Sequence, residues 1–424
     1  MTRGDSLPIR IEPGSVNGRV MAPASKSVAQ RAIALAAVSS GRSEIWFPGR
    51  CDDVLAAIRV CRAMGARIRE GEDKLLIDGG VQPPAVALNC GESGLGIRMF
   101  SGLSAAFDQE VSLTATGSLL QRPMHIIQHS LQALGVQCRT NNGFPPITVR
   151  GPLRGGRAKI DASLSSQVLT GLLMAAPMAR TDCYLEVENL KSIPYIDTTL
   201  MVMKAFGAGV ENRGYREFFI PAPQVYKPAK FVVEGDWSGG AFLLVAGAVA
   251  GKVRVDNLDV ASTQADKKII QALETAGAGL KGSDGGKTQG AIEAGRKNLK
   301  GFEFDATHCP DLFPPLTALA ANCQGLSRIH GTGRLAAKES DRAAALIDTF
   351  GRIGIRLWIE GDNTLVVEGG EIHGGTIHSH GDHRIAMAGA IAALNSKTGV
   401  SIENPGVVSK SYPGFFADLE AMKV

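Results

Sequence analysis

Aromatic side chains are scarce in this sequence. Trp, Tyr and Phe together make up 5% of the 424 residues, so few rings are present on which the bases of single-stranded nucleic acid could stack. No run of five like charges occurs, and 45 Lys and Arg against 41 Asp and Glu leave a net charge of +4. A nucleic-acid-binding surface usually has a concentrated basic patch. The mild, scattered excess of positive charge is more typical of an enzyme for small anionic substrates.

Long hydrophobic segments are also missing. The longest strongly apolar run, residues 241–251, is too short to cross a bilayer, and the N-terminus lacks the apolar core of a signal peptide. The seven cysteines are scattered, odd in number and without a CxxC pair. This distribution indicates reduced, buried thiols rather than a disulfide framework. We therefore expect a cytoplasmic protein.

The sequence does contain a repeat of about 70 residues. A helical segment that ends in glycine and continues as an alternating strand recurs five times. A glycine just after a helix is typical of the left-handed position that ends it. The five glycines are Gly65, Gly135, Gly207, Gly277 and Gly354, at intervals of 70, 72, 70 and 77 residues.

A second kind of helix recurs with the same period. Each one opens with a short polar cap and continues as an apolar run rich in Ala and Leu, which is how a buried helix begins. The six openings are marked by Ser27, Ser93, Ser166, Ser238, Asp311 and Asp382, at intervals of 66, 73, 72, 73 and 71 residues. Two independent markers with one period predict an α/β fold of six repeats, each of the βαβαββ type.

Six such repeats are too large for one core, so we expect two similar domains of three repeats each. The sixth repeat stops at its second helix, residues 415–424, and we expect the N-terminal strand, residues 7–13, to supply its missing piece. This pairing places both termini in one domain. The predicted boundaries give a discontinuous domain of residues 1–20 and 236–424 and an inserted domain of residues 21–235.

The polar helix openings are the candidate functional sites. Helix N-termini attract anions, and three openings from each domain would form a positively charged cleft between the domains. Arg and Lys side chains in these loops suit phosphate and carboxylate ligands. Two acids among many cations, Asp311 and Glu339, favour proton transfer over metal binding.

Nine short strings, in a fixed order along the chain, carry a resemblance to a known family. They are PASKSVAQRA (23–32), QRP (121–123), DASLSSQVLTGLLMAAP (161–177), IPYIDTTLMVMKAFG (193–207), VVEGDWS (232–238), CPDLFPP (309–315), AAKESDR (336–342), GDHRIAMA (381–388) and VSKSYPGFF (408–416). With these strings the sequence resembles the EPSP synthase family of enolpyruvyl transferases along nearly its whole length. The resemblance implies two domains, each an inside-out α/β barrel, with the active site in the cleft between them.

The resemblance also implies a reaction. In this family the 5-hydroxyl of shikimate 3-phosphate attacks C2 of phosphoenolpyruvate while C3 is protonated. The resulting tetrahedral intermediate loses phosphate, and C3 returns a proton. The reaction belongs to the shikimate pathway of aromatic amino-acid biosynthesis. The resemblance implies no metal or other cofactor, no nucleic-acid or membrane partner, and a monomeric enzyme.

Individual roles follow from the positions that match the family strings. The catalytic candidates are Asp311, Glu339 and Lys26. The candidates for binding shikimate 3-phosphate are Lys26, Ser27, Arg31, Ser165, Ser166, Gln167, Ser192, Tyr195, Asp311 and Lys338. The candidates for binding phosphoenolpyruvate are Lys26, Gly94, Arg122, Gln167, Arg342, Arg384 and Lys410.

Three segments depart from the family pattern. GESGLG (91–96) replaces a GNAGT-like string, so Glu92 places a carboxylate and Leu95 places extra bulk beside the expected phosphoenolpyruvate site. We expect Leu95 to alter sensitivity to the inhibitor glyphosate. In residues 333–339 the substrate-contacting Asn expected near position 334 is not evident, and Gly381 stands where many members have Asn.

Three other functions are alternatives to this one. Enolpyruvyl transfer to UDP-N-acetylglucosamine is the nearest alternative, but that family opens with Lys-Asn where this chain has Lys26-Ser27, and it carries a reactive Cys that residues 114–123 lack. The string His378–His383 resembles the HxHxDH motif of dizinc hydrolases, although no His follows it. RNA 3′-end-processing enzymes share the repeat architecture, but the low aromatic content and the lack of a basic cluster disfavour them.

Overall fold

The computed structural model describes residues 7–163, 165–282 and 290–424. The chain divides into two compact units, an inserted unit of Ala24–Val233 and a terminal unit that combines the segment up to Pro23 with Glu234–Val424. These boundaries lie two to three residues from those expected from the repeat. The carbonyl oxygen of Pro23 accepts a hydrogen bond of 2.7 Å from the backbone N–H of Asp236, and this bond ties both crossing segments to the terminal unit.

The inserted unit contains three four-stranded sheets with one strand plan. Their orders are β14-β3-β5-β4, β6-β7-β9-β8 and β10-β11-β13-β12. In each sheet the first two strands are parallel and the remaining pairs are antiparallel. The strands are β3 (Arg42–Trp46), β4 (Arg67–Glu70), β5 (Lys74–Asp78), β6 (Leu88–Asn89), β7 (Val111–Thr114), β8 (Gln137–Asn141), β9 (Phe144–Arg150), β10 (Gly156–Asp161), β11 (Cys183–Glu188), β12 (Glu211–Arg213), β13 (Glu217–Ile220) and β14 (Lys230–Val232).

The terminal unit repeats the plan with the sheets β16-β17-β15-β2, β18-β19-β21-β20 and β1-β23-β22. Its strands are β1 (Ile9–Ile11), β2 (Val16–Met21), β15 (Gly251–Asp256), β16 (Gly279–Gly282), β17 (Ala291–Gly295), β18 (Glu303–Asp305), β19 (Gly325–His330), β20 (Arg356–Glu360), β21 (Thr364–Gly369), β22 (Gly375–His378) and β23 (Val400–Glu403). The third sheet has three strands because the sixth repeat is incomplete.

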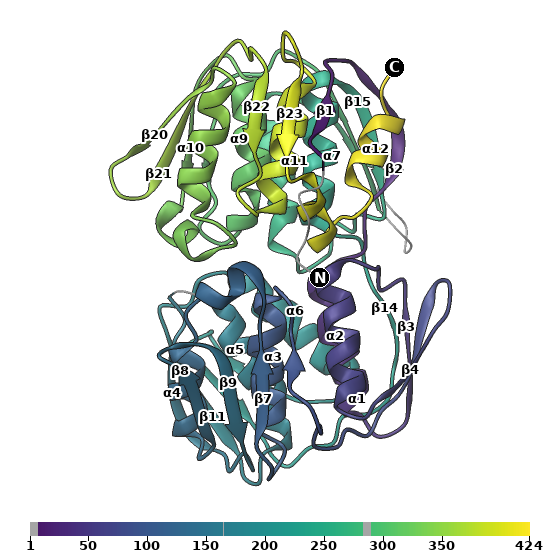
Figure 1. The fold of residues 1–424 in the computed structure, drawn as a ribbon, viewed down its shortest axis with the longest axis vertical. Helices are drawn as coiled ribbons and strands as arrows, with labels where there is room; N and C mark the ends of the chain where they lie inside the picture. Colours follow the sequence, from purple (N-terminus) through teal and green to yellow (C-terminus); the bar gives the residue numbers. More distant parts are fainter. Residues whose placement is uncertain (1–6, 164, 283–289) are drawn as a thin grey trace. The chain divides into compact units, whose positions relative to one another are not determined.

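The N-terminal strand adds the third strand to the sheet of that sixth repeat, as expected from the sequence. β22 and β23 are parallel, and β1 pairs antiparallel with β23, with Ile9 opposite Ile402 and Ile11 opposite Val400. Figure 1 shows the purple β1 lying beside the yellow β23, although the two are almost the full chain length apart in sequence.

Each unit has three helices that are buried along their whole length or nearly so. They are α1 (Lys26–Val38), α3 (Gly94–Ser104) and α5 (Ser166–Ala175) in the inserted unit, and α7 (Trp237–Ala250), α9 (Phe313–Ala321) and α11 (His383–Ala393) in the terminal unit. All 14 residues of α7 are buried, and a helix that is apolar all round needs protein on every side. These are the helices whose openings the sequence marks.

The other helices bury one face and alternate with the inner ones along the chain. They are α2 (Asp52–Ala63), α4 (His125–Ala133), α6 (Ile193–Ala205), α8 (Ile269–Ala276), α10 (Arg342–Arg352) and α12 (Phe415–Ala421). Short 3₁₀ turns lie before or after some of the inner and outer helices. They are η1 (Gly117–Gln121), η2 (Ala176–Met178), η3 (Ala265–Lys268), η4 (Pro310–Leu312), η5 (Thr332–Ala337) and η6 (Pro405–Lys410). Among the described residues, no helix is long and apolar enough to cross a membrane.

The five repeat glycines adopt the backbone conformation expected of them. Their φ values are +96°, +80°, +81°, +86° and +91° for Gly65, Gly135, Gly207, Gly277 and Gly354. Residues with a Cβ rarely adopt such angles, whereas glycine does so at little cost. The periodic glycines therefore end their helices in the same way in five repeats.

Close contact between α3 and α5 depends on the absence of a side chain at Gly171. A Cβ at this position would overlap the backbone carbonyl oxygen of Arg98 on α3. We expect Gly171→Ala to destabilise the protein by about 1–3 kcal/mol, because the two helices would have to separate. The measurement is calorimetric unfolding.

A matched control is Gly351→Ala in α10, where a Cβ meets nothing within 4 Å. There the higher helix propensity of alanine should raise stability by about 0.5–1 kcal/mol. Equal stability of the two variants would contradict the close α3–α5 packing described above.

Candidate active site

In the inserted unit, three side-chain contacts join the openings of the inner helices. Ser93, the N-cap of α3, donates from Oγ to Oε1 of Gln30 on α1 at 2.6 Å. Arg98 on α3 donates from Nη1 to Oε1 of Gln167 at the start of α5 at 3.1 Å. Arg31 on α1 donates to Oγ1 of Thr170 on α5 at 3.3 Å. The structure thus brings the three predicted openings of this unit together.

Arg31 is a buried connector in this arrangement. It is 1% exposed, and it donates to Ser27 O and Oγ, Thr170 Oγ1, Thr199 Oγ1 and Tyr195 O. These bonds use all five of its N–H donors. Burial lowers the pKa of Arg31 to about 10, which still leaves it charged at neutral pH. In this structure it positions Ser27 and Tyr195, and donation to a ligand would require the exchange of one of these bonds.

Lys26 opens α1 and is held by an acid from α2. Its Nζ lies 2.8 Å from Oδ2 of Asp53, and both side chains are largely buried, with 14% and 7% exposed. Asp53 stands in the first turn of α2, where the helix dipole favours a negative charge. The pair holds a lysine ammonium at the opening of α1.

Gly94 and Arg122 are close neighbours in the inserted unit. A side chain at position 94 would overlap the guanidinium of Arg122, so the glycine lets this cation approach the opening of α3. Leu95 follows and is 7% exposed.

The Glu92 carboxylate is directed at the η1 turn that precedes Arg122. A Cβ on Gly117 would overlap this carboxylate, and Ser118 Oγ donates to Glu92 Oε2 at 3.4 Å. Glu92, which departs from the family pattern, therefore contacts the turn that leads into Arg122. Arg122 is one of the residues predicted to bind phosphoenolpyruvate.

The serines of the third opening and of the following loop are placed by backbone geometry. Ser165 caps α5, its Oγ accepting a 3.2 Å bond from Gln167 N–H, and Ser166 is 4% exposed. Ser192 precedes α6 at a φ of +57° and is 2% exposed. Tyr195, in the first turn of α6, accepts from Arg31 through its backbone oxygen.

In the terminal unit, Arg342 binds three carboxylates at once. Its side chain has no exposed area, and Nε contacts Asp382 Oδ2 at 2.9 Å, Nη1 contacts Asp311 Oδ1 at 2.8 Å and Nη2 contacts Glu339 Oε2 at 2.8 Å. Asp382 is also fully buried, and it caps α11 by accepting from Arg384 N–H at 2.9 Å. One guanidinium thus fixes side chains from η4, the η5–α10 loop and the opening of α11.

Asp311 is surrounded by cations. Lys338 Nζ lies 3.3 Å from its Oδ1, and Arg384 Nη2 lies 3.2 Å from its Oδ2. Burial alone would raise the pKa of Asp311, but the charges of Arg384, Lys338 and Arg342 outweigh it and hold that pKa well below the usual range. Burial lowers the pKa of Lys338 to about 8, against the opposing charge of Asp311.

Lys410 completes this group, which we call the acid–arginine cluster. Its Nζ lies 3.9 Å from Glu339 Oε1, and the side chain is 3% exposed. The cluster comprises Asp311, Lys338, Glu339, Arg342, Asp382, Arg384 and Lys410. Three carboxylates and four cations leave one excess positive charge, which suits an anionic ligand.

The first two histidines of the HxHxDH string are hydrogen-bonded within the protein. His378 Nδ1 accepts from the backbone N–H of His380, and His380 Nε2 lies 3.0 Å from Asp348 Oδ2. Asp382 is committed to Arg342 and to the α11 cap. Within the part of the chain that the structure describes, no group of three or more His, Cys, Asp or Glu could hold a metal ion.

The other departures also have local explanations. Gly381 has a φ of +67°, a left-handed conformation that glycine and asparagine adopt most readily. Gly333 N–H donates to Asn363 Oδ1 at 3.1 Å, so an asparagine from the β20–β21 turn binds the start of η5.

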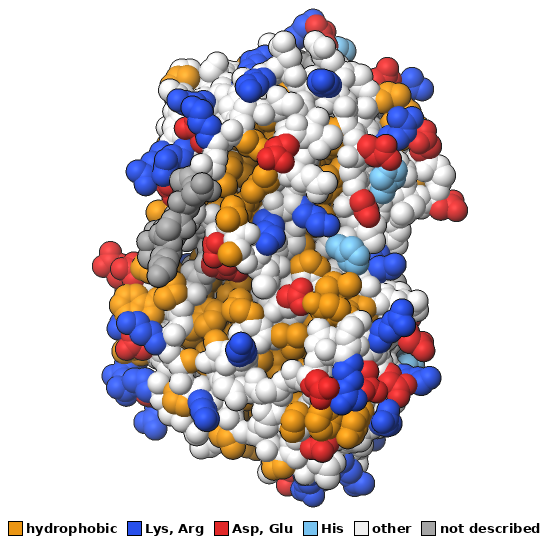
Figure 2. Space-filling model, turned by 180° about the vertical axis from the view of Figure 1, so that it is seen from behind, with side chains coloured by type: hydrophobic (Ala, Val, Ile, Leu, Met, Phe, Trp, Pro, Cys, Tyr) orange, Lys and Arg blue, Asp and Glu red, His pale blue; other side chains and the backbone are white. Residues whose placement is uncertain are grey.

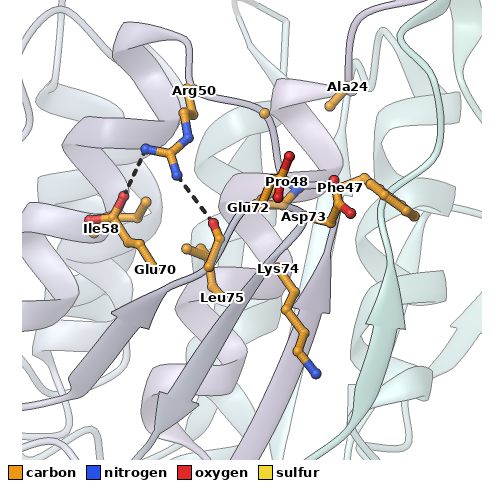
Figure 3. Close-up of a pocket in the computed structure, with 12 residues that line it drawn as sticks. Ala24, Phe47, Pro48, Arg50, Ile58, Glu70, Glu72, Asp73, Lys74 and Leu75 are labelled. Atoms are coloured by element: carbon orange, nitrogen blue, oxygen red, sulfur yellow. Dashed lines mark hydrogen bonds and ion pairs between the residues drawn. The ribbon is translucent and has the colours of Figure 1, made fainter.

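A cavity of about 280 Å³ in the inserted unit lies between the loop after β3 and the β4–β5 turn. Arg50 crosses it to Glu70 and to the carbonyl oxygen of Gly71 (Figure 3). None of the predicted site residues lines this cavity. The face seen in Figure 2 shows acidic and basic side chains interspersed, without a concentrated basic patch.

The chain as a whole, with its helix openings, acid–arginine cluster and six sheets, matches a known protein family. A family model described as EPSP synthase (3-phosphoshikimate 1-carboxyvinyltransferase) matches residues 11–419. The chain belongs to this family. The prediction of an enolpyruvyl transferase of the shikimate pathway is thereby confirmed.

Relatives and solved structures agree with this assignment. A 3-phosphoshikimate 1-carboxyvinyltransferase of Methanocorpusculum labreanum is 35% identical, with 97% of each chain covered, and one of Aeropyrum pernix is 36% identical, with 96% and 94% covered. An EPSP synthase structure from Acinetobacter baumannii has a TM-score of 0.84 at 27% identity, covering 99% and 98%. The enolpyruvyl transferase NikO from Streptomyces tendae, at 18% identity and a TM-score of 0.79, shares the fold. The predicted two-domain α/β fold is confirmed.

Sequence reasoning did not offer Asp53 and Asp382 as site residues, although each is buried and bonded to a candidate. Asp382 stood in the quoted string GDHRIAMA and marked a helix opening, so its capping position was a usable signal. Asp53 reaches Lys26 across 27 residues, a separation that no local pattern reveals.

The buried Asp382–Arg342 pair should be essential for the terminal unit. We expect Asp382→Asn to destabilise this unit by about 3 kcal/mol, because the fully buried Arg342 would lose one of three compensating charges. Chemical denaturation measures the effect.

Asp348→Asn, at the exposed ion pair with Arg352 in which 38% and 55% of the side chains are accessible, is the control. Its cost should be at most about 0.5 kcal/mol. Similar losses in both variants would show that burial does not determine the strength of the Asp382 contact.

Proposed function

We propose that residues of both units bind the two substrates of enolpyruvyl transfer and carry out its proton transfers. Seven groups would bind phosphoenolpyruvate: Lys26, the backbone at Gly94, Arg122, Gln167, Arg342, Arg384 and Lys410. Ten residues would bind shikimate 3-phosphate: Lys26, Ser27, Arg31, Ser165, Ser166, Gln167, Ser192, Tyr195, Asp311 and Lys338. Both units would act on the same pair of substrates.

The observation that carries this proposal is the surroundings of Asp311. Its two oxygens contact Lys338, Arg342 and Arg384 at 2.8–3.3 Å. In the free protein these cations stabilise the ionised form, and Asp311 is a weak base. Substrate phosphate and carboxylate groups would draw the same cations to themselves, which raises the pKa of Asp311. Asp311 then accepts the proton of the attacking 5-hydroxyl only when both substrates are bound.

Glu339 and Lys26 would serve the other proton transfers. Glu339 is held by Arg342 at 2.8 Å, and the pair Lys26–Asp53 keeps an ammonium at the opening of α1. We assign to these two groups the protonation of C3, its later deprotonation and assistance to the departing phosphate. Charge stabilisation by fixed cations would supply a large part of the rate.

We also propose that the reaction needs no metal or redox cofactor, and that the enzyme is a cytoplasmic monomer. The alternative acceptor, UDP-N-acetylglucosamine, is tested directly below.

Phosphate release from phosphoenolpyruvate tests the substrate assignment. We expect release with shikimate 3-phosphate as acceptor and background rates with UDP-N-acetylglucosamine or with no acceptor. Release with UDP-N-acetylglucosamine would show the alternative activity. Background rates with every acceptor would contradict the proposal.

The proton-transfer roles predict a characteristic loss in two variants. Asp311→Asn and Glu339→Gln should each reduce kcat by roughly a hundredfold or more, while the KM values change by less than about tenfold. Steady-state kinetics with phosphate release as the signal measures both. Near-normal kcat in either variant would remove that residue from proton transfer.

A further inference from the structure

Asp266 is a buried carboxyl group that the proposed mechanism does not use. It lies in η3 and is 2% exposed. Its Oδ2 accepts a hydrogen bond from Ser238 Oγ at the start of α7, and its Oδ1 has no hydrogen-bond partner among the described residues. No ion pair in that part of the chain includes it. An ionised carboxylate is costly in such a place, so this group favours its neutral form.

Charged groups from several elements act on Asp266. η3 and η4 both pack against α7. The charges that act on Asp266 are those of Asp311 in η4, Arg384 in α11 and Asp236, the cap of α7, and Asp266 in turn acts on the thiol of Cys309. Lys268, which lies on η3 together with Asp266, has an opposing electrostatic effect on the pKa of the Cys309 thiol. Burial and the charge of Asp311 raise the pKa of Asp266 to about 7, against the opposing effects of Arg384 and the Ser238 bond.

Asp266 and Asp311 therefore form a coupled pair of acids. The charge of Arg384 acts on both, but only Asp311 contacts this arginine. Below about pH 7 the pair carries one negative charge, with the proton on Asp266, because like charges on coupled buried acids repel. Arg384 then has one direct carboxylate partner rather than two competing ones.

We propose that Asp266 is a positioning residue for Asp311 and Arg384: a carboxylic acid that stays neutral in the ligand-free enzyme and so leaves the charge of Arg384 available to the substrate anion. This inference rests on the proposed roles of those two residues. Ionisation of Asp266 would add a second negative charge near Arg384, and this cation would hold phosphoenolpyruvate less tightly. Bound phosphoenolpyruvate would in turn oppose the ionisation of Asp266.

The pH dependence of the kinetics follows from this coupling. The ratio kcat/KM reports groups of the free enzyme, and kcat reports groups of the substrate complex. Ionisation of Asp266 should therefore lower kcat/KM for phosphoenolpyruvate above about pH 7, whereas kcat should be unaffected until higher pH. Substrate phosphates also titrate near this range, so the informative quantity is the difference between the enzyme and its variants.

Asp266→Asn places a permanently neutral group of the same shape at this position. Between pH 6 and 8.5, kcat/KM for phosphoenolpyruvate should fall about tenfold more in the unaltered enzyme than in this variant. Ser238→Ala removes a bond that lowers the pKa of Asp266, so it should shift the fall to higher pH. Asp305→Asn is the matched control and should keep the unaltered profile. Asp305 lies at the end of β18 and accepts a hydrogen bond from Thr307 within its own turn.

Infrared difference spectra read the protonation of Asp266 without turnover. The substrate-free enzyme minus Asp266→Asn should show a protonated carboxyl band at pH 6 that is lost by pH 8.5. No such band at pH 6, or a band together with identical kinetic profiles, would overturn the proposal. If Asp266→Asn fails to fold, the shift in Ser238→Ala decides in its place. If the unaltered enzyme releases no phosphate, the proposed function fails, and the infrared band still decides whether Asp266 is neutral.

Discussion

Burial of the Arg342 guanidinium is the constraint on which the rest of the terminal unit depends. A cation without exposed area must be compensated by nearby carboxylates, and Asp311, Glu339 and Asp382 each bind a different nitrogen of this side chain. These acids come from two repeats, Asp311 and Glu339 from the fifth and Asp382 from the sixth. Their shared contact with Arg342 fixes their positions relative to one another before any ligand arrives. The proton-transfer candidates are therefore oriented by charge balance within the protein.

The two units use the same repeat in different ways at the helix openings. In the inserted unit, one cross-link joins the neutral side chains of Ser93 and Gln30, and the other two run from Arg98 and Arg31 to the neutral acceptors Gln167 and Thr170. In the terminal unit the corresponding positions carry Asp311, Asp382 and Arg384, which form ion pairs. The same strand and helix plan thus links its openings through neutral acceptors in one unit and through carboxylates in the other.

Much of the fold could be predicted from local sequence patterns, because the fold is a repeat whose glycines and helix openings recur at regular intervals. The glycines at 70–77 residue intervals adopt positive φ values, and the incomplete sixth repeat correctly predicted the pairing of β1 with β23. The site was harder, since its chemistry depends on pairs such as Arg98–Gln167 and Ser238–Asp266 that are distant in sequence. Residue type identified Asp311 as an acid among cations, but only the three-dimensional contacts show that these cations keep its pKa low.

That low pKa has a consequence for the order of events in catalysis. A carboxylate stabilised by three cations cannot deprotonate a hydroxyl efficiently, because its conjugate acid is too strong. In the proposed mechanism those same cations bind phosphate and carboxylate anions. Each anion that bound would weaken the field on Asp311 and raise its basicity. Substrate binding and base activation would then be two aspects of one charge balance, and Asp311 would remain too weak a base to act on phosphoenolpyruvate in the absence of an acceptor.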